Sequence, residues 1–180
     1  HVLRPGRRPE EVSLFQTTDW SRTRAYGVGL NALYLNLKGR EAQGIVRPEE
    51  KLPLLRELAY KLEQVTDPLT GERVILKAYI SQEVFSGAHV AEAPDIILGF
   101  NRNYRISWNS PLGSFPRELI ENNPQKWSGD HMTAPDLIPG VLLANRPARL
   151  ESPALEDVTA GILSLFGVKI PPEISGRPVF

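Results

Sequence analysis

The residues best suited to chemistry lie in one short stretch, WSGDH, which spans residues 127–131. It brings Ser128, Asp130 and His131 together just before the apolar run 137–143, which is typical of a buried strand. His131 is a candidate metal ligand, a candidate base, or a loop residue beside a core strand. A neutral imidazole is a good zinc ligand, and carboxylates are the usual oxygen ligands that accompany it.

A serine nucleophile at Ser128 is not favoured by this spacing. Such a nucleophile needs a base within hydrogen-bond reach, and the base must be oriented by a third group, which neighbours in one short loop seldom achieve. The sequence also contains no Gly-x-Ser-x-Gly nucleophile elbow. We therefore interpret Ser128 as part of a surface turn.

The histidines provide only part of the ligand set that a metal site needs. There are three, His1, His89 and His131, and no two have the i, i+4 spacing that places both on one helix face. Asp95 and Asp136 are carboxylates that could converge with His131.

Asp130 directly precedes His131, which allows it to be a carboxylate that supports the ligand without touching the metal. Against this, adjacent side chains rarely point to the same place. The residues alone provide one metal-ligand candidate, without enough partners to hold a catalytic ion.

Composition narrows the range of functions. Lys plus Arg number 21 and Asp plus Glu number 21, so no net charge favours a nucleic acid or an anionic membrane as partner. Hydrophobic residues make up 41% and charged residues 23%, as in ordinary globular proteins. No stretch approaches the ~20 apolar residues of a membrane-spanning helix. The absence of cysteine rules out disulfides, thiolate ligands and cysteine nucleophiles.

The elements that must position these residues interleave along the chain. The segment 1–18 holds prolines and arginines without periodicity, which indicates a connector before a domain over 19–180. Apolar patterning predicts strands over 31–39, 73–80, 93–100, 103–108 and 137–144, and helices over 51–65 and 115–123. This order indicates an α/β sandwich with buried, partly parallel strands.

The last predicted helix has the clearest boundaries. Ser152 can cap it with Pro153 at its first position, and Gly167 offers the left-handed conformation that ends helices. Its expected apolar stripe consists of Leu155, Val158, Ile162, Leu165 and Phe166.

Four segments, 19–46, 93–108, 127–147 and 155–180, run in an order that resembles the C-terminal part of type I phosphodiesterases/nucleotide pyrophosphatases. These enzymes form a branch of the alkaline phosphatase superfamily. The resemblance rests on the Asn-Leu-Lys-Gly-Arg-Glu stretch, the Gly-Asp-His loop and the closing helix with its Gly-Arg-Pro end. It implies a partial alkaline-phosphatase-like sandwich, with a mixed sheet flanked by helices.

The resemblance also implies an activity. Family members hydrolyse phosphate esters with two divalent metals, usually zinc, and a threonine or serine nucleophile bound to one of them. By resemblance His131 is one of the metal ligands, while Asp130 does not inherit that role.

The sequence departs from the family by lacking an Asp-His-Gly triplet, which belongs to the N-terminal part of these enzymes together with the nucleophile. We therefore expect this chain to be the C-terminal portion of a longer enzyme, and the N-terminal portion to be its partner. Alone it should be inactive and bind at most one zinc weakly. The alternative is a non-catalytic binding or interaction module that keeps the fold without the site.

Overall fold

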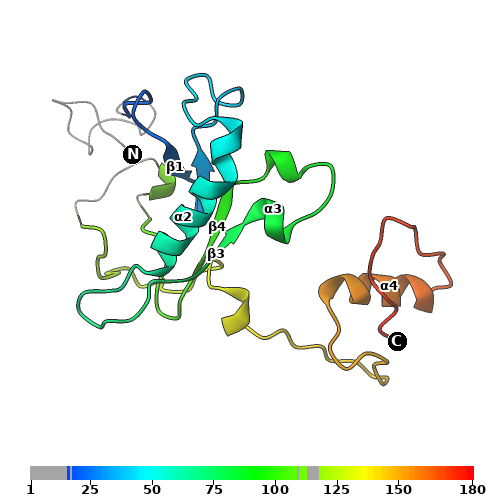
Figure 1. Ribbon diagram of the computed structural model, residues 1–180. Helices are drawn as coiled ribbons and strands as arrows, with labels where there is room; N and C mark the ends of the chain where they lie inside the picture. Colours follow the sequence, from blue (N-terminus) through cyan, green and yellow to red (C-terminus); the bar gives the residue numbers. More distant parts are fainter. Residues whose placement is uncertain (1–15, 17, 109, 113–117) are drawn as a thin grey trace. The chain divides into compact units, whose positions relative to one another are not determined.

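The computed structural model describes residues 16, 18–108, 110–112 and 118–180, in two units that divide between Pro139 and Gly140 (Figure 1). Apart from residues 16 and 18, the predicted connector lies outside the described residues. Within the described residues, no helix is both long enough and apolar enough to span a bilayer.

The first unit is built on a four-stranded sheet in the order β1-β2-β4-β3 (Figure 1). Its strands are β1 (Ala25–Val28), β2 (Ala32–Leu35), β3 (Ile75–Ile80) and β4 (Ile96–Phe100). The mixed α/β class predicted from the sequence is confirmed, but the expected parallel strands are wrong. Every pair of neighbouring strands is antiparallel, and parallel pairing among the described residues is limited to isolated bridges.

The connections explain this pairing. A tight hairpin joins β1 to β2, with Val28 opposite Ala32, and such a short connection permits only antiparallel strands. Short helices join β3 to β4, which also run in opposite directions. The longest helix in the described part of this unit, α2 (Lys51–Glu63), connects β2 to β3, which are not neighbours in the sheet.

Two of the helices follow the sequence closely. α2 begins at Lys51, directly after the 3-10 turn η2 (Pro48–Glu50), and it tolerates Pro53 because the first turn of a helix needs no backbone donor. α4 (Leu155–Leu165) ends before Gly167, whose φ of 64° is the predicted left-handed conformation. Its predicted start is wrong: the helix begins at Leu155 with Ala154 at the N-cap, so Ser152 is not the cap and Pro153 is not its first residue. The shorter helices are α3 (Ser81–Val84), η3 (Val90–Glu92), η4 (Ser110–Leu112) and η5 (Pro135–Leu137).

Three predicted elements are wrong in the described residues. Residues 103–108 and 137–144 form no strand, and the described part of the predicted helix, 118–123, is not helical. In the second of these, Val141 and Leu143 are exposed rather than buried. Pro139 and Gly140 both disfavour regular strand pairing, so apolar composition alone did not specify a strand there.

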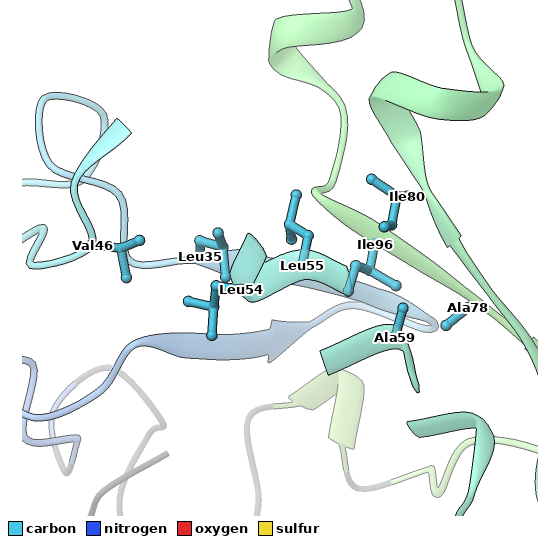
Figure 2. Close-up of a cluster of buried hydrophobic side chains, with 8 residues drawn as sticks. All are labelled: Leu35, Val46, Leu54, Leu55, Ala59, Ala78, Ile80 and Ile96. Carbon is cyan, nitrogen blue, oxygen red and sulfur yellow. The ribbon is translucent and has the colours of Figure 1, made fainter. Parts of the chain in front are cut away.

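α2 covers one face of the sheet and forms the core with it (Figure 2). Leu55 of α2, Leu35 of β2 and Ile96 of β4 are all fully buried in this cluster. Each such side chain contributes about 1.5–3 kcal/mol when it leaves water. The buried members of the core are Leu35, Val46, Leu54, Leu55, Ala59, Ala78, Ile80 and Ile96.

β3 is an edge strand, and a side chain occupies part of its free edge. The Glu63 carboxylate, at the end of α2, accepts a hydrogen bond from the Ala78 backbone N–H at 3.0 Å. The same oxygen atom lies 3.2 Å from the Lys77 ammonium nitrogen.

The second unit is organised around α4 and the C-terminal tail. Asp157 is buried and accepts hydrogen bonds from the backbone N–H groups of Ala154, at 2.9 Å, and Arg177, at 2.7 Å. The helix face that contacts the tail carries Ala160 and Gly161, with Val179 packed against Gly161. The predicted apolar stripe is therefore not the buried face. Most of the stripe is exposed, as Leu155, Ile162, Leu165 and Phe166 show.

Substituting Gly44 by alanine should destabilise the protein by about 1–3 kcal/mol, because the new Cβ would collide with the Leu37 backbone carbonyl. The measurement is the free energy of unfolding from urea denaturation. Gly140→Ala is the matched control, since nothing lies within 4 Å of its Cβ position, and it should stay within about 0.5 kcal/mol of wild type. Equal effects of the two substitutions would contradict this packing.

Candidate functional site

The His131 loop is attached to the end of the sheet by backbone hydrogen bonds. The Phe100 N–H donates to the Met132 carbonyl at 2.9 Å, and the Ala134 N–H donates to the Phe100 carbonyl at 2.8 Å. Gly99 permits this approach, because a Cβ there would lie 3.0 Å from Ala134 atoms. The sequence thus places His131 next to the C-terminal end of β4.

Asp130 is held in place by Arg105. The Arg105 Nε atom lies 3.3 Å from Asp130 Oδ2, and the two side chains are only 12% and 8% exposed. Arg105 also donates to the Gly129 carbonyl at 3.2 Å, and Asp130 Oδ1 accepts from the His131 backbone N–H at 2.7 Å. Asp130 therefore fixes the backbone of the loop, and no hydrogen bond joins it to the imidazole among the described residues.

The His131 side chain is exposed to solvent. An exposed imidazole can bind a divalent cation or accept a proton, because its ring is free to turn toward a ligand. Within the described part of the chain, no group of three His, Asp or Glu side chains is arranged to hold a metal ion.

Among the described residues, no hydrogen bond or ion pair joins the His131 side chain to the other residues singled out by the sequence. Ser128 is an exposed loop residue, and Asp136 is an exposed member of η5. His89 is exposed and its Nδ1 lies 2.9 Å from Glu92. His1 lies outside the described residues.

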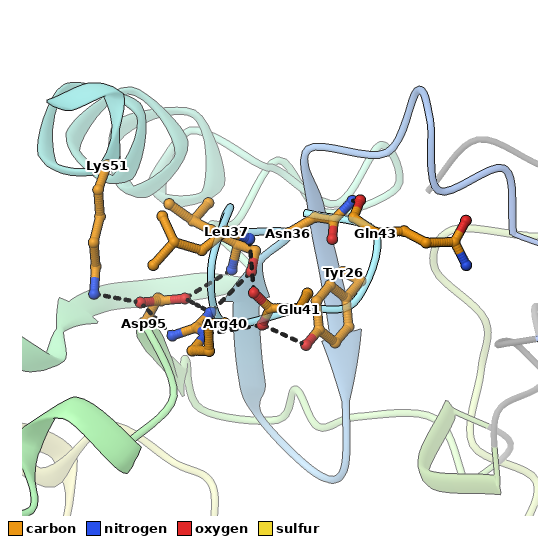
Figure 3. A network of polar contacts seen from close by, with 9 residues as sticks. Tyr26, Asn36, Leu37, Arg40, Glu41, Gln43, Lys51 and Asp95 are labelled. Atoms are coloured by element: carbon orange, nitrogen blue, oxygen red, sulfur yellow. Dashed lines mark hydrogen bonds and ion pairs between the residues drawn. The ribbon is translucent and has the colours of Figure 1, made fainter. Parts of the chain in front are cut away.

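Asp95 does not converge with His131, because it precedes β4 whereas the His131 loop joins the strand's other end. Five residues of extended chain separate these ends by roughly 16 Å. Asp95 is instead the centre of a buried polar cluster (Figure 3). It accepts hydrogen bonds from Arg40 Nη2 at 2.6 Å and the Leu35 N–H at 2.7 Å, and it pairs with Lys51 at 2.9 Å.

The charges around Asp95 decide its ionisation. Burial raises the pKa of the carboxyl group, but the hydrogen bonds from Arg40, Leu35 and Lys51 outweigh burial and hold its pKa below the ordinary value. The Asp95 side chain is 1% exposed, whereas those of Arg40 and Lys51 are 28% and 26% exposed. The carboxylate is therefore closed off from any ligand, and its contacts are those of a structural ion pair.

Glu41 extends the cluster toward β1 (Figure 3). Its carboxylate accepts hydrogen bonds from the Leu37 N–H at 2.7 Å, Arg40 Nε at 2.8 Å and the Tyr26 hydroxyl at 3.0 Å. Burial, together with the Glu41 carboxylate, raises the pKa of Tyr26 to about 12. Glu41 thus closes the turn that carries Arg40.

Sequence reasoning did not assign roles to Arg40 and Arg105, although each is the main partner of an aspartate. Arg40 lies in the Asn-Leu-Lys-Gly-Arg-Glu stretch, which the sequence analysis singled out, but its ion pair with Asp95 was not predicted. Arg105 lies in a segment interpreted as a strand. Its three-residue separation from Trp108 was the available signal of a stacked pair.

In comparisons with known proteins, no family model, curated protein or solved structure matches this chain.

Substituting Asp95 by asparagine should lower the free energy of unfolding by about 3–5 kcal/mol at pH 7, because Arg40 and Lys51 would lose their buried counter-charge. Urea denaturation measures the loss. Glu92→Gln is the control: its side chain is exposed, and little change is expected.

The difference between wild type and Asp95→Asn should also depend on pH. The folded-state pKa of Asp95 is lowered, so its stabilising contribution is complete above the unfolded pKa of about 3.9 and is lost as pH falls through the folded pKa. Unfolding measured between pH 7 and pH 2 should show a constant gap down to about pH 5, which narrows below about pH 4. A gap that widens on acidification would contradict the ion pair.

Proposed function

We propose that this chain is the C-terminal portion of a metal-dependent phosphodiesterase of the nucleotide pyrophosphatase type, and that His131 supplies one metal ligand. The resemblance of the Asn-Leu-Lys-Gly-Arg-Glu stretch, the Gly-Asp-His loop and the Gly-Arg-Pro end supports this proposal. The single structural observation behind it is the exposed imidazole, carried on a loop that is hydrogen-bonded to the end of β4.

The proposal includes a finer fold assignment. The two units would be parts of an alkaline-phosphatase-like sandwich, whose larger sheet would come from the N-terminal portion of the same protein. Exposed apolar side chains on the second unit, such as Val141, Leu155 and Phe166, are compatible with further packing partners.

In this assignment the residues of this chain provide one metal ligand and hold the loop that carries it. His131 would donate a ring nitrogen to one of two divalent cations, which are usually zinc in such enzymes. Asp130 and Arg105 would hold the loop that carries it. The bound cations would neutralise phosphoryl oxygens and lower the pKa of a threonine or serine nucleophile, which we expect from the N-terminal portion.

A second candidate function is a non-catalytic interaction module. The same exposed apolar side chains favour it, since an interaction module would bury such side chains against its partner. The coding sequence upstream of His1 separates the two functions. A nucleophile region and an Asp-His-Gly triplet would support the hydrolase, and their absence would support the module.

His131→Asn in the full-length protein should reduce kcat/KM for an aryl phosphodiester by at least ~100-fold, because a metal would lose an imidazole ligand. Release of the aryl alcohol, followed with and without added zinc, is the measurement. His89→Asn is the matched control, since that histidine is also exposed and pairs only with Glu92 among the described residues. If both variants kept wild-type activity, His131 would not be a ligand.

The 180-residue chain alone should bind no more than one zinc ion weakly and should not hydrolyse aryl phosphodiesters, because one imidazole cannot fill a four-coordinate site. Elemental analysis of protein purified without a metal-affinity step measures the content. Two tightly bound metals, or metal-dependent hydrolysis by this chain, would contradict the proposed division of the site.

A further inference from the structure

A small cavity lies beside the Asp95 cluster, between the start of α2, the start of α3 and the segment that leads into β4. Its volume is about 10 Å³, which is near the lower limit for holding one water molecule. The cavity therefore admits only a very small molecule, and its polar lining decides which one. The residues that line it include Lys51, Leu55, Ser81, Val90, Pro94 and Asp95.

One polar group of this lining, the Ser81 hydroxyl, is buried without a partner. Ser81 is 3% exposed, and its Oγ atom has no hydrogen-bond partner among the described residues. The backbone at this position is fixed, because the Ser81 N–H donates to the Asp95 carbonyl at 3.1 Å. A buried hydroxyl without a hydrogen bond raises the free energy of the folded chain, so a ligand that bonds it is stabilising.

The charged groups of the lining select the charge of that ligand. Asp95 Oδ1 accepts from Arg40 Nη1 at 3.2 Å and pairs with Lys51 at 2.9 Å, and Oδ2 is bonded to Arg40 Nη2 and the Leu35 N–H. These contacts fill the acceptor sites of the carboxylate. The Lys51 ammonium has three donors, and its ion pair with Asp95 uses one (Figure 3). Because Asp95 repels an anion and Lys51 repels a cation, the cavity favours a neutral molecule.

We infer that this cavity binds one water molecule, which accepts a hydrogen bond from the Lys51 ammonium and shares a second with the Ser81 hydroxyl. Buried waters typically make roughly two to four hydrogen bonds to groups that otherwise lack partners. Through this water the side chain at the start of α3 is joined to the start of α2, so the polar cluster around Asp95 extends to α3. The site does not depend on the proposed function.

A crystal structure of this chain tests the site directly. An ordered water should lie within hydrogen-bonding distance of both Ser81 Oγ and Lys51 Nζ. Crystals soaked in bromide provide the control for charge, because bromide is located by its anomalous scattering and should not enter the cavity. A wild-type crystal without an ordered water at this position, or a bromide ion in its place, would overturn the inference.

Ser81→Ala tests the hydrogen bond in solution through the sign of the stability change. If water bonds the hydroxyl, the substitution removes a satisfied hydrogen bond and should lower the urea concentration at the midpoint of unfolding. If the hydroxyl is unsatisfied, its removal relieves a buried polar group and should raise that midpoint. Ser164→Ala is the matched control, since Ser164 is exposed in α4 and reports the effect of serine-to-alanine exchange on a helix alone. A Ser81→Ala midpoint at or above that of wild type would overturn the inference.

Discussion

The first unit depends on one buried carboxylate. Asp95 lies just before β4, and its oxygen atoms contact the end of β2 through the Leu35 N–H, the following loop through Arg40, and the start of α2 through Lys51. Three segments far apart in the sequence are thereby fixed at one point. Burial of an unpaired carboxylate would cost several kcal/mol, so the cluster forms only when all three segments are in place. This mutual requirement positions β4, and the His131 loop is bonded to β4.

Local patterning predicted much of this structure. The alternation in residues 31–39 and the apolar run 93–100 gave β2 and β4, and the helical spacing of 51–65 gave α2. Pairing direction was not predictable in the same way, because it depends on which strands become neighbours. The exposed segment after Pro139 shows a related limit, since apolar composition does not specify what the residues pack against.

The candidate site also has residues that the sequence could predict and residues that it could not. His131 could be picked out from its residue type and its place before an apolar run. The position of Asp95 relative to His131 could not be predicted. Only the structure shows that Asp95 lies at the start of β4, whereas the loop that carries His131 is bonded to the end of β4. Arg105 was missed for a similar reason: its role comes from Asp130 and Trp108 together, and the first of these is 25 positions away in the sequence.

Glu63 has a consequence for how the protein behaves at high concentration. The free edge of β3 would otherwise offer backbone donors to a strand of another molecule, which is a common route to aggregation. Because the Glu63 carboxylate occupies the Ala78 donor in the middle of that strand, an incoming strand would have to displace a charged side chain and its Lys77 partner. The end of α2 therefore protects solubility as well as covering the sheet.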